Sequence, residues 1–351
     1  MRFLHETLPQ RIRFASAEAA ASLASEIQVL GSERVMVIAS ESGGRLAQRI
    51  TADIPVALQH HEAVTHVPVA VAERARAAAT TCRADVLVSI GGGSATGLAK
   101  AVALTTGLPI VAVPTTYAGS EVTDVWGMTE GTTKTTGRDP RVLPKAVVYD
   151  ASLTQSLPIA TSIASGLNAV AHCVDSLWAP RADPVNAALA TEGIRALRVG
   201  LPQLISSPTA IEGRERTLFG AYLAAAAFAS AGSGLHHKIC HVLGGMFDLP
   251  HAQTHAAVLP HVLAFNAAHA PEAERRLAAA FDAPDAISGL RALHERLHAP
   301  TALRDYGMPE SGIVPAARAV VAAALTLANP APVSTDAISH LLRRAREGAE
   351  L

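Results

Sequence analysis

The chain has 351 residues, of which 49% are hydrophobic and 4% aromatic, and its formal net charge is −1. A chain of this length exceeds one ordinary hydrophobic core, so two domains are expected. The balanced charge excludes proteins that bind nucleic acid or anionic membranes through their overall charge. The longest apolar stretch, residues 221–231, is far too short to cross a bilayer.

The N-terminal sequence and the cysteines indicate the cellular compartment. The sequence from Met1 to Pro9 lacks the apolar run of a secretory signal peptide. Cys82, Cys173 and Cys240 form neither a CxxC motif nor a disulfide pattern. We therefore expect a cytoplasmic protein in which each cysteine is a small buried apolar residue.

Residues 1–152 alternate short apolar strands with helices. The predicted strands are 33–39, 63–71, 85–90 and 109–113. Continuous apolar strands separated by helices predict a parallel sheet with helices on both faces. Right-handed crossovers place the loops that follow these strands at one edge, where such sheets bind ligands.

From residue 153 onward, helical patterns dominate and no strand is evident. The predicted helices are 163–178, 184–204, 213–230, 234–245, 271–280, 286–298, 313–327 and 333–347, with prolines between several of them. This pattern predicts a separate all-helical domain, residues 153–351, joined to the α/β domain by a short connection near Asp150.

A glycine run follows the third predicted strand and precedes a helix. Gly91, Gly92, Gly93 and Ser94 would let backbone N–H groups approach a pyrophosphate at a helix N-terminus. The run is not a GxGxxG fingerprint, because Thr96 occupies the third glycine position, and a tight turn is the alternative. Hydroxyl groups after the next strand strengthen the prediction of nucleotide binding; they belong to Thr115, Thr116 and Ser120.

Ser40 ends the first predicted strand. Nucleotide-binding sheets often place an acidic residue here, against the ribose 2′-hydroxyl of NAD. A small neutral serine does not repel a 2′-phosphate, so we predict that both NADH and NADPH are accepted.

Histidines are concentrated in the second domain. His237 and His241 share one face of a predicted helix, which Gly244 and Gly245 are expected to end, and His251 follows. At the same spacing, Asn168 and His172 share a face of an earlier helix.

These residues are similar to a divalent-metal site of three imidazoles, with an amide at the position of a carboxylate. Replacing the carboxylate by Asn168 removes the one ligand charge, although His172, His237 and His251 could still hold zinc. The sequence leaves open a metal-free polar pocket, a catalytic metal, or histidines that are only packed; the first is favoured.

The motifs together resemble the iron-containing alcohol dehydrogenase superfamily, which has a dehydroquinate synthase-like fold. They are Gly91-Gly-Gly-Ser94, Pro114-Thr-Thr116, Asn168-x-x-x-His172, and His237-x-x-x-His241 with Pro250-His251. In that superfamily the positions of Asn168, His172, His237 and His251 hold iron or zinc through an aspartate and three histidines. The position of His241 is an additional active-site histidine. This chain departs from the pattern at Asn168.

More narrowly, three stretches resemble the maleylacetate reductase branch: residues 66–75, 115–127 and 234–245. The resemblance implies an enzyme that uses NADH or NADPH to reduce the conjugated C=C bond of maleylacetate, giving 3-oxoadipate in aromatic-compound degradation. Several members of the branch work without an added metal, which agrees with Asn168.

The resemblance also implies roles for side chains. Hydride addition to a double bond conjugated to a ketone leaves an enolate, to which His172, His237 and His251 would donate hydrogen bonds. His241 would act as the acid that protonates the α carbon. The substrate is a dicarboxylate, and the candidate residues that bind it are Asn168, Lys134, Arg138 and Lys238.

Three other functions are weighed against this one. They are a metal-dependent alcohol dehydrogenase or aldehyde reductase, a carbon–oxygen lyase that retains its nicotinamide, and a non-enzymatic metal-binding protein, which would not need the glycine loop. The alanine-rich helices offer flat surface for self-association, and a homodimer is the default expectation.

Overall fold

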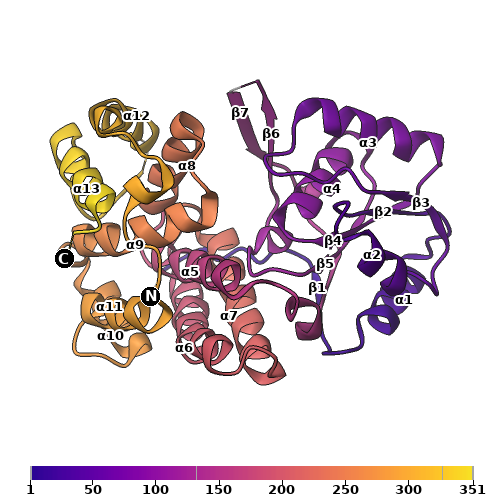
Figure 1. The fold of residues 1–351 in the computed structure, drawn as a ribbon, viewed down its shortest axis with the longest axis horizontal. Coiled ribbons are helices and arrows are strands. Elements are labelled where there is room, and N and C mark those ends of the chain that lie inside the picture. Colours follow the sequence, from indigo (N-terminus) through magenta and orange to yellow (C-terminus); the bar gives the residue numbers. More distant parts are fainter. Residues whose placement is uncertain (1, 132, 326, 350–351) are drawn as a thin grey trace. The chain divides into compact units, whose positions relative to one another are not determined.

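The computed structural model describes residues 2–131, 133–325 and 327–349 (Figure 1). These residues form two compact units, one spanning Leu8–Leu157 and the other combining residues 2–7 with the described residues from Pro158 onward. The boundary therefore lies after Leu157 and not after 152, because Leu153 still packs into the core of the sheet. Residues 2–7 join the helical unit, where His5 Nδ1 lies 2.8 Å from Asp183 Oδ2.

The unit Leu8–Leu157 is built on a six-stranded sheet in which every pairing is parallel. The strand order across the sheet is β1-β8-β5-β4-β2-β3. The strands are β1 (Arg11–Phe14), β2 (Val35–Ile38), β3 (Val56–His60), β4 (Val86–Gly91), β5 (Ile110–Pro114) and β8 (Ala146–Tyr149). The predicted parallel sheet is confirmed, and the inner strands β2, β5 and β8 are buried along their whole length.

Helices cover both faces of this sheet (Figure 1). On one face, α1 (Ala19–Leu30) and α2 (Gly44–Ile50) pack against Val35 and Val37 of β2. On the other face, α3 (Val69–Thr81) and α4 (Gly93–Thr106) pack against Met36 and Ile38. Successive side chains of one strand thus enter two separate cores, which is why the strand sequence is apolar without alternation.

One predicted strand is wrong. Residues 63–71 are not a strand; the strand is β3, and α3 begins at Val69 behind Pro68. The buried residues of α3 recur at helical spacing: Ala72, Ala75 and Ala79. Over a few residues, a mixture of valine and alanine is compatible with the spacing of both a strand and a helix. In the structure, these residues pack as part of a helix.

Some strands of this unit were not predicted. They include the edge strand β1, its neighbour β8, and an antiparallel hairpin of β6 (Val125–Glu130) and β7 (Thr133–Arg138). In the hairpin, Trp126 pairs with Gly137, and a Cβ at Gly137 would lie 2.8 Å from the indole ring. The glycine thus leaves room for the tryptophan ring across the strand pair.

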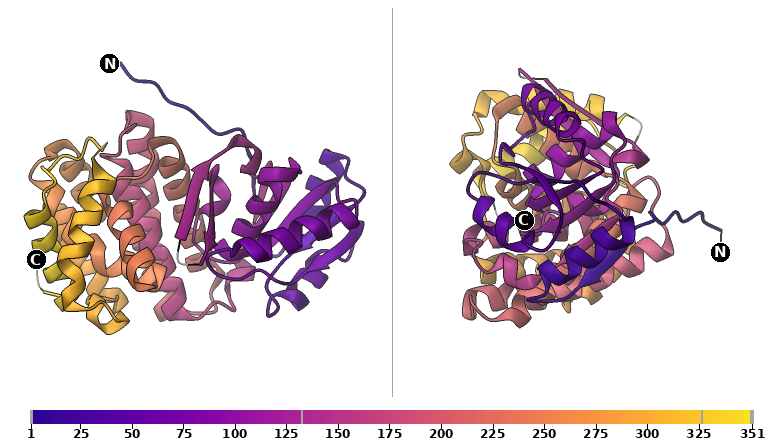
Figure 2. Two further views of the ribbon diagram at one scale, coloured as in Figure 1. Left: turned by 90° about the horizontal axis from the view of Figure 1, so that it is seen from above. Right: turned by 90° about the vertical axis from the view of Figure 1, so that its right-hand side faces the viewer.

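The second unit is helical, as predicted. Its α-helices are α5 (Ile159–Ser176), α6 (Pro184–Ser206), α7 (Ile211–Ala231), α8 (Leu235–Phe247), α9 (His251–Ala267), α10 (Pro271–Phe281), α11 (Ala286–Leu297), α12 (Ile313–Ala324) and α13 (Thr335–Glu347). Helix α9 was not predicted, because Pro260 lies inside it. Helices α12 and α13 lie side by side in Figures 1 and 2 and share a core with α8 and α9.

Among the described helices, none alone has the length and apolarity needed to cross a membrane. The pair α7 and α8 meets that criterion only when joined, and the two are bent by 97° at the break between them.

Candidate active site

The predicted glycine loop lies at the carboxyl end of β4. Gly91 has φ +146°, a conformation that side chains disfavour, and Gly92 caps the N-terminus of α4. The Thr115 N–H donates to Gly91 O at 3.0 Å, so the Gly91–Ser94 loop and the Thr115–Thr116 loop are neighbours, as predicted. A Cβ at Gly92 would lie 2.9 Å from Thr116 Cγ2. The loop is thus a backbone cradle at a helix N-terminus, which fits a pyrophosphate.

Ser40 lies two residues beyond the end of β2, at the same edge of the sheet. Its hydroxyl accepts a hydrogen bond from Gly43 N at 3.2 Å and lies 3.2 Å from the hydroxyl of Ser42. The segment after β2 therefore presents the hydroxyl groups of Ser40 and Ser42, with the exposed Glu41 between them in the sequence.

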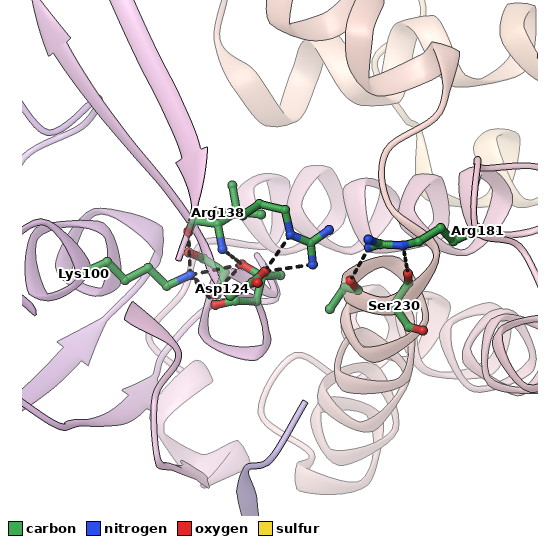
Figure 3. Close-up of polar contacts among 9 residues, drawn as sticks. Lys100, Asp124, Arg138, Arg181 and Ser230 are labelled. Atoms are coloured by element: carbon green, nitrogen blue, oxygen red, sulfur yellow. Dashed lines mark hydrogen bonds and ion pairs between the residues drawn. The ribbon is translucent and has the colours of Figure 1, made fainter. Parts of the chain in front are cut away.

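Sequence reasoning missed Lys100, whose side chain is completely buried. Its ammonium group donates to the backbone carbonyls of Ser120 (2.6 Å), Thr123 (2.7 Å) and Val125 (2.8 Å), and to Thr123 Oγ1 at 3.0 Å (Figure 3). Burial lowers the pKa of Lys100 to about 7, while the negative charges of Glu121 and Asp124 oppose this shift. Lys100 belongs to α4, the helix that begins at the glycine loop. Its hydrogen bonds thus hold the loop containing Ser120 against this helix.

Replacing Lys100 by methionine should lower the free energy of unfolding by about 3 kcal/mol, because three carbonyls, one of them buried, lose their donor. Urea denaturation measures this change. The matched control is Lys145→Met, which removes an exposed lysine and should leave the free energy of unfolding within about 0.5 kcal/mol of the parent. Equal midpoints for the two variants would contradict the structural role of Lys100.

The predicted carboxylate-binding cations have different surroundings. The guanidinium of Arg138 is paired with Asp124, with Nη2 2.9 Å and Nε 3.0 Å from Asp124 Oδ1 (Figure 3). The side chain of Lys134 lies outside the described residues. Lys238 is half-buried on α8, between the predicted active-site histidines. The geometry thus gives Arg138 a partner within its own unit, and its role in substrate binding stays a prediction.

In the helical unit, the structure brings the predicted histidines together. The rings of His172 on α5 and His237 on α8 are stacked, with centroids 4.9 Å apart and planes at 14°. The His241 ring centroid lies 6.3 Å from that of His237 and 6.4 Å from that of His251, at the first position of α9. His172 and His237 are buried, whereas His241 and His251 are exposed. The cluster therefore has a buried base and an accessible rim.

Two local features place these side chains. Helix α8 continues past Gly244 and Gly245 to Phe247, contrary to prediction, and ends at Asp248 with φ 51°. The connection before α8 is held by Arg181, whose Nε donates to Ser230 O near the end of α7 at 2.8 Å (Figure 3). The Phe228 ring of α7 lies 4.4 Å from the His237 ring, so an apolar wall borders the cluster.

Burial governs the charge of the inner histidines. It holds the pKa of His172 well below its usual value, with further lowering by His237 and His251. It also lowers the pKa of His237 strongly, and His241 and His251 add to that effect. Both rings are therefore neutral near pH 7.

Sequence reasoning missed two further buried histidines and a carboxylate. His236 Nε2 and His255 Nδ1 lie 2.9 Å apart, and Cys240 Sγ lies 3.7 Å from His236 Nε2. Among the described residues, these three offer donor atoms that all lie within 4.8 Å of one another. The carboxylate is that of Asp175, one turn after His172 on α5, and it lies 2.6 Å from His237 Nδ1. The spacing His172-x-x-Asp175 was the available signal.

Asn168 lies one turn before His172 on α5, so the two share a face of that helix as predicted. Its side chain is buried, and its Oδ1 atom has no hydrogen-bond partner in the described part of the chain. A divalent ion held by His172, His237 and His251 would thus meet a neutral amide where a carboxylate is expected. The three imidazoles could hold such an ion, but without a ligand charge to offset its two positive charges the site is weaker than one with a carboxylate.

Comparisons with known proteins agree with this architecture. Residues 9–151 match the iron-containing alcohol dehydrogenase family, and residues 162–346 match the C-terminal part of the Fe-containing alcohol dehydrogenase family. The maleylacetate reductase of Sphingobium indicum is 46% identical over 351 residues, which cover 99% of this chain and 98% of the relative. That of Burkholderia cepacia is 44% identical over 348 residues, with coverage of 99% and 98%.

Solved structures give the same result. An iron-containing alcohol dehydrogenase from Corynebacterium glutamicum is 56% identical, with a TM-score of 0.98 and coverage of 100% of this chain and 98% of the other. A maleylacetate reductase from Agrobacterium tumefaciens is 41% identical, with a TM-score of 0.94 and full coverage of both chains. The chain therefore belongs to the iron-containing alcohol dehydrogenase family.

Proposed function

We propose that this chain is a maleylacetate reductase, which uses NADH or NADPH to reduce the conjugated C=C bond of maleylacetate to 3-oxoadipate without a metal. The observation that carries the proposal is the histidine cluster with Asn168 at its base, in a chain whose full-length relatives at 43–46% identity are maleylacetate reductases. An uncharged amide at this position suits a pocket that binds substrate through hydrogen bonds.

The glycine cradle and the hydroxyl groups of the Leu8–Leu157 unit would hold the nucleotide. The groups are the backbone of Gly91, Gly92 and Gly93 and the hydroxyls of Ser94, Thr115, Thr116, Ser120 and Ser40. When bound, the reduced nicotinamide supplies a hydride to the carbon β to the ketone of the substrate, which leaves an enolate. Ser40 carries no negative charge that would repel the 2′-phosphate of NADPH, so either NADH or NADPH can bind.

The histidine cluster completes the reaction. Imidazole N–H groups stabilise the enolate oxygen as negative charge develops on it. His241 is exposed at the rim and protonates the α carbon, since an accessible imidazole can regain its proton from water between turnovers. The buried walls around His172 and His237 exclude water from the enolate.

The test is NADH oxidation with maleylacetate by chelator-treated protein whose zinc and iron have been quantified. We expect one NADH consumed per 3-oxoadipate formed, at a rate that chelation leaves unchanged. NADPH should also serve, with the two kcat/KM values within a thousandfold of each other.

Two outcomes would contradict the proposal. Activity that disappears on chelation and returns with iron or zinc would favour a metal-dependent alcohol dehydrogenase, the description borne by the Corynebacterium glutamicum relative. Turnover of another substrate without net loss of NADH would favour a lyase that retains its nicotinamide.

A further inference from the structure

The Asp175 side chain is completely buried against the base of the histidine cluster. Its Oδ2 atom accepts from the backbone N–H of Gly234 at 3.0 Å and of His237 at 3.2 Å, and lies 2.6 Å from His237 Nδ1. Its Oδ1 atom accepts from Trp178 Nε1 at 3.3 Å. A buried carboxylate with this many donors is held in one orientation.

The backbone is shaped to bring this carboxylate to His237. Gly234 caps the N-terminus of α8, and a Cβ there would lie 2.6 Å from Asp175 Oδ1. Any larger residue would push the carboxylate away from the start of the helix. The first turn of α8 and the carboxylate therefore fit together only because residue 234 is glycine.

The contacts of Asp175 also locate a proton. A backbone N–H group can only donate, so Oδ2 is an acceptor toward Gly234 and His237. The carboxyl proton of a neutral acid would have to occupy this same crowded oxygen to reach Nδ1. Burial raises the pKa of Asp175, whereas nearby His236 and the hydrogen bonds from His237, Trp178 and Gly234 lower it. These donors favour an ionised Asp175 that accepts the proton of His237 Nδ1 in the 2.6 Å contact.

We propose that Asp175 is a positioning residue that holds His237 as the Nδ1–H tautomer, so that Nε2 presents a lone pair to the active site. Among residues 2–131, 133–325 and 327–349, the buried His237 Nε2 has no hydrogen-bond partner, as expected of an atom kept for a ligand. The inference deepens the proposed function, on which its kinetic test rests.

This assignment changes the part expected of His237. A neutral His237 accepts a hydrogen bond at Nε2 and cannot donate one to the enolate oxygen. Donation then falls to the other histidines of the cluster, His172 and His251. His237 instead orients a substrate group that carries a proton, such as a hydroxyl or a protonated carboxyl.

The first test needs neither substrate nor a variant at Asp175. Long-range ¹H–¹⁵N correlation spectra of the ¹⁵N-histidine-labelled protein report the tautomer of each neutral ring, and the signal absent in His237→Gln identifies His237. We expect a protonated Nδ1 and an unprotonated Nε2. A protonated Nε2 on neutral His237 would overturn the proposal, whatever the enzyme reduces.

The second test is kinetic. Asp175→Ala removes the acceptor and should lower kcat about 10–100-fold, with the KM for NADH within about twofold, and should move His237 toward the Nε2–H tautomer. The matched control is Ser176→Ala, which changes the adjacent buried residue, whose hydroxyl donates to His172 O of its own helix. A kcat of Asp175→Ala within threefold of the parent would overturn the positioning role. If this variant does not fold, the spectrum of the parent protein still decides.

Discussion

Replacing His241 by alanine should lower the maximal rate of maleylacetate reduction by about 100-fold or more at pH 7. General acid catalysis by a positioned side chain contributes roughly this much, and an exposed imidazole at the rim of the cluster can exchange its proton with water. Steady-state kinetics with saturating NADH measure the effect.

The control is His269→Ala, which removes an exposed histidine outside the cluster and should leave kcat unchanged. If His241→Ala retains a maximal rate within about threefold of the parent, His241 is not the acid. A variant that loses activity but recovers it with added imidazole would support the assignment.

Replacing Asn168 by aspartate should raise the affinity for zinc by about 100-fold or more. The change places a negative charge one helical turn from His172, in a buried site where a charge pair is weakly screened, and so restores the one ligand charge of a three-imidazole, one-carboxylate site. Competition titration against a chromogenic zinc chelator measures the change.

Asn168→Leu is the matched control, since it has a similar volume and no charge, and its zinc affinity should not exceed that of the parent. Equal zinc affinities for the aspartate variant and the parent would contradict the view that Asn168 is what weakens the metal site. In that case the geometry of the three imidazoles, and not the ligand charge, would limit binding.

Much of the site could be predicted from the sequence because its side chains lie four residues apart, the spacing of neighbours on one face of a helix. His237 and His241, like Asn168 and His172, are four residues apart, and a helix places such pairs on one face. The glycine loop lies between a continuous apolar strand and a helix, a context that fixes its place at the carboxyl edge of a parallel sheet. These features depend on neighbours within one or two turns.

Other features depend on partners distant in the chain. The strand β1 is recognisable only through β8, since Arg11 pairs with Ala146 across more than a hundred residues. Lys100 looks like an ordinary helix lysine until the carbonyls of Ser120, Thr123 and Val125 are seen to surround its ammonium group.

The sequence by itself determined the α/β and helical halves, the glycine cradle, and the histidines with an amide in place of a carboxylate. Only the tertiary structure decided that Asp175 faces His237, and hence which nitrogen of that ring carries the proton. The physical reason is that periodicity assigns a side chain to a face of its own helix, whereas hydrogen bonding between α5 and α8 requires the packing of both helices.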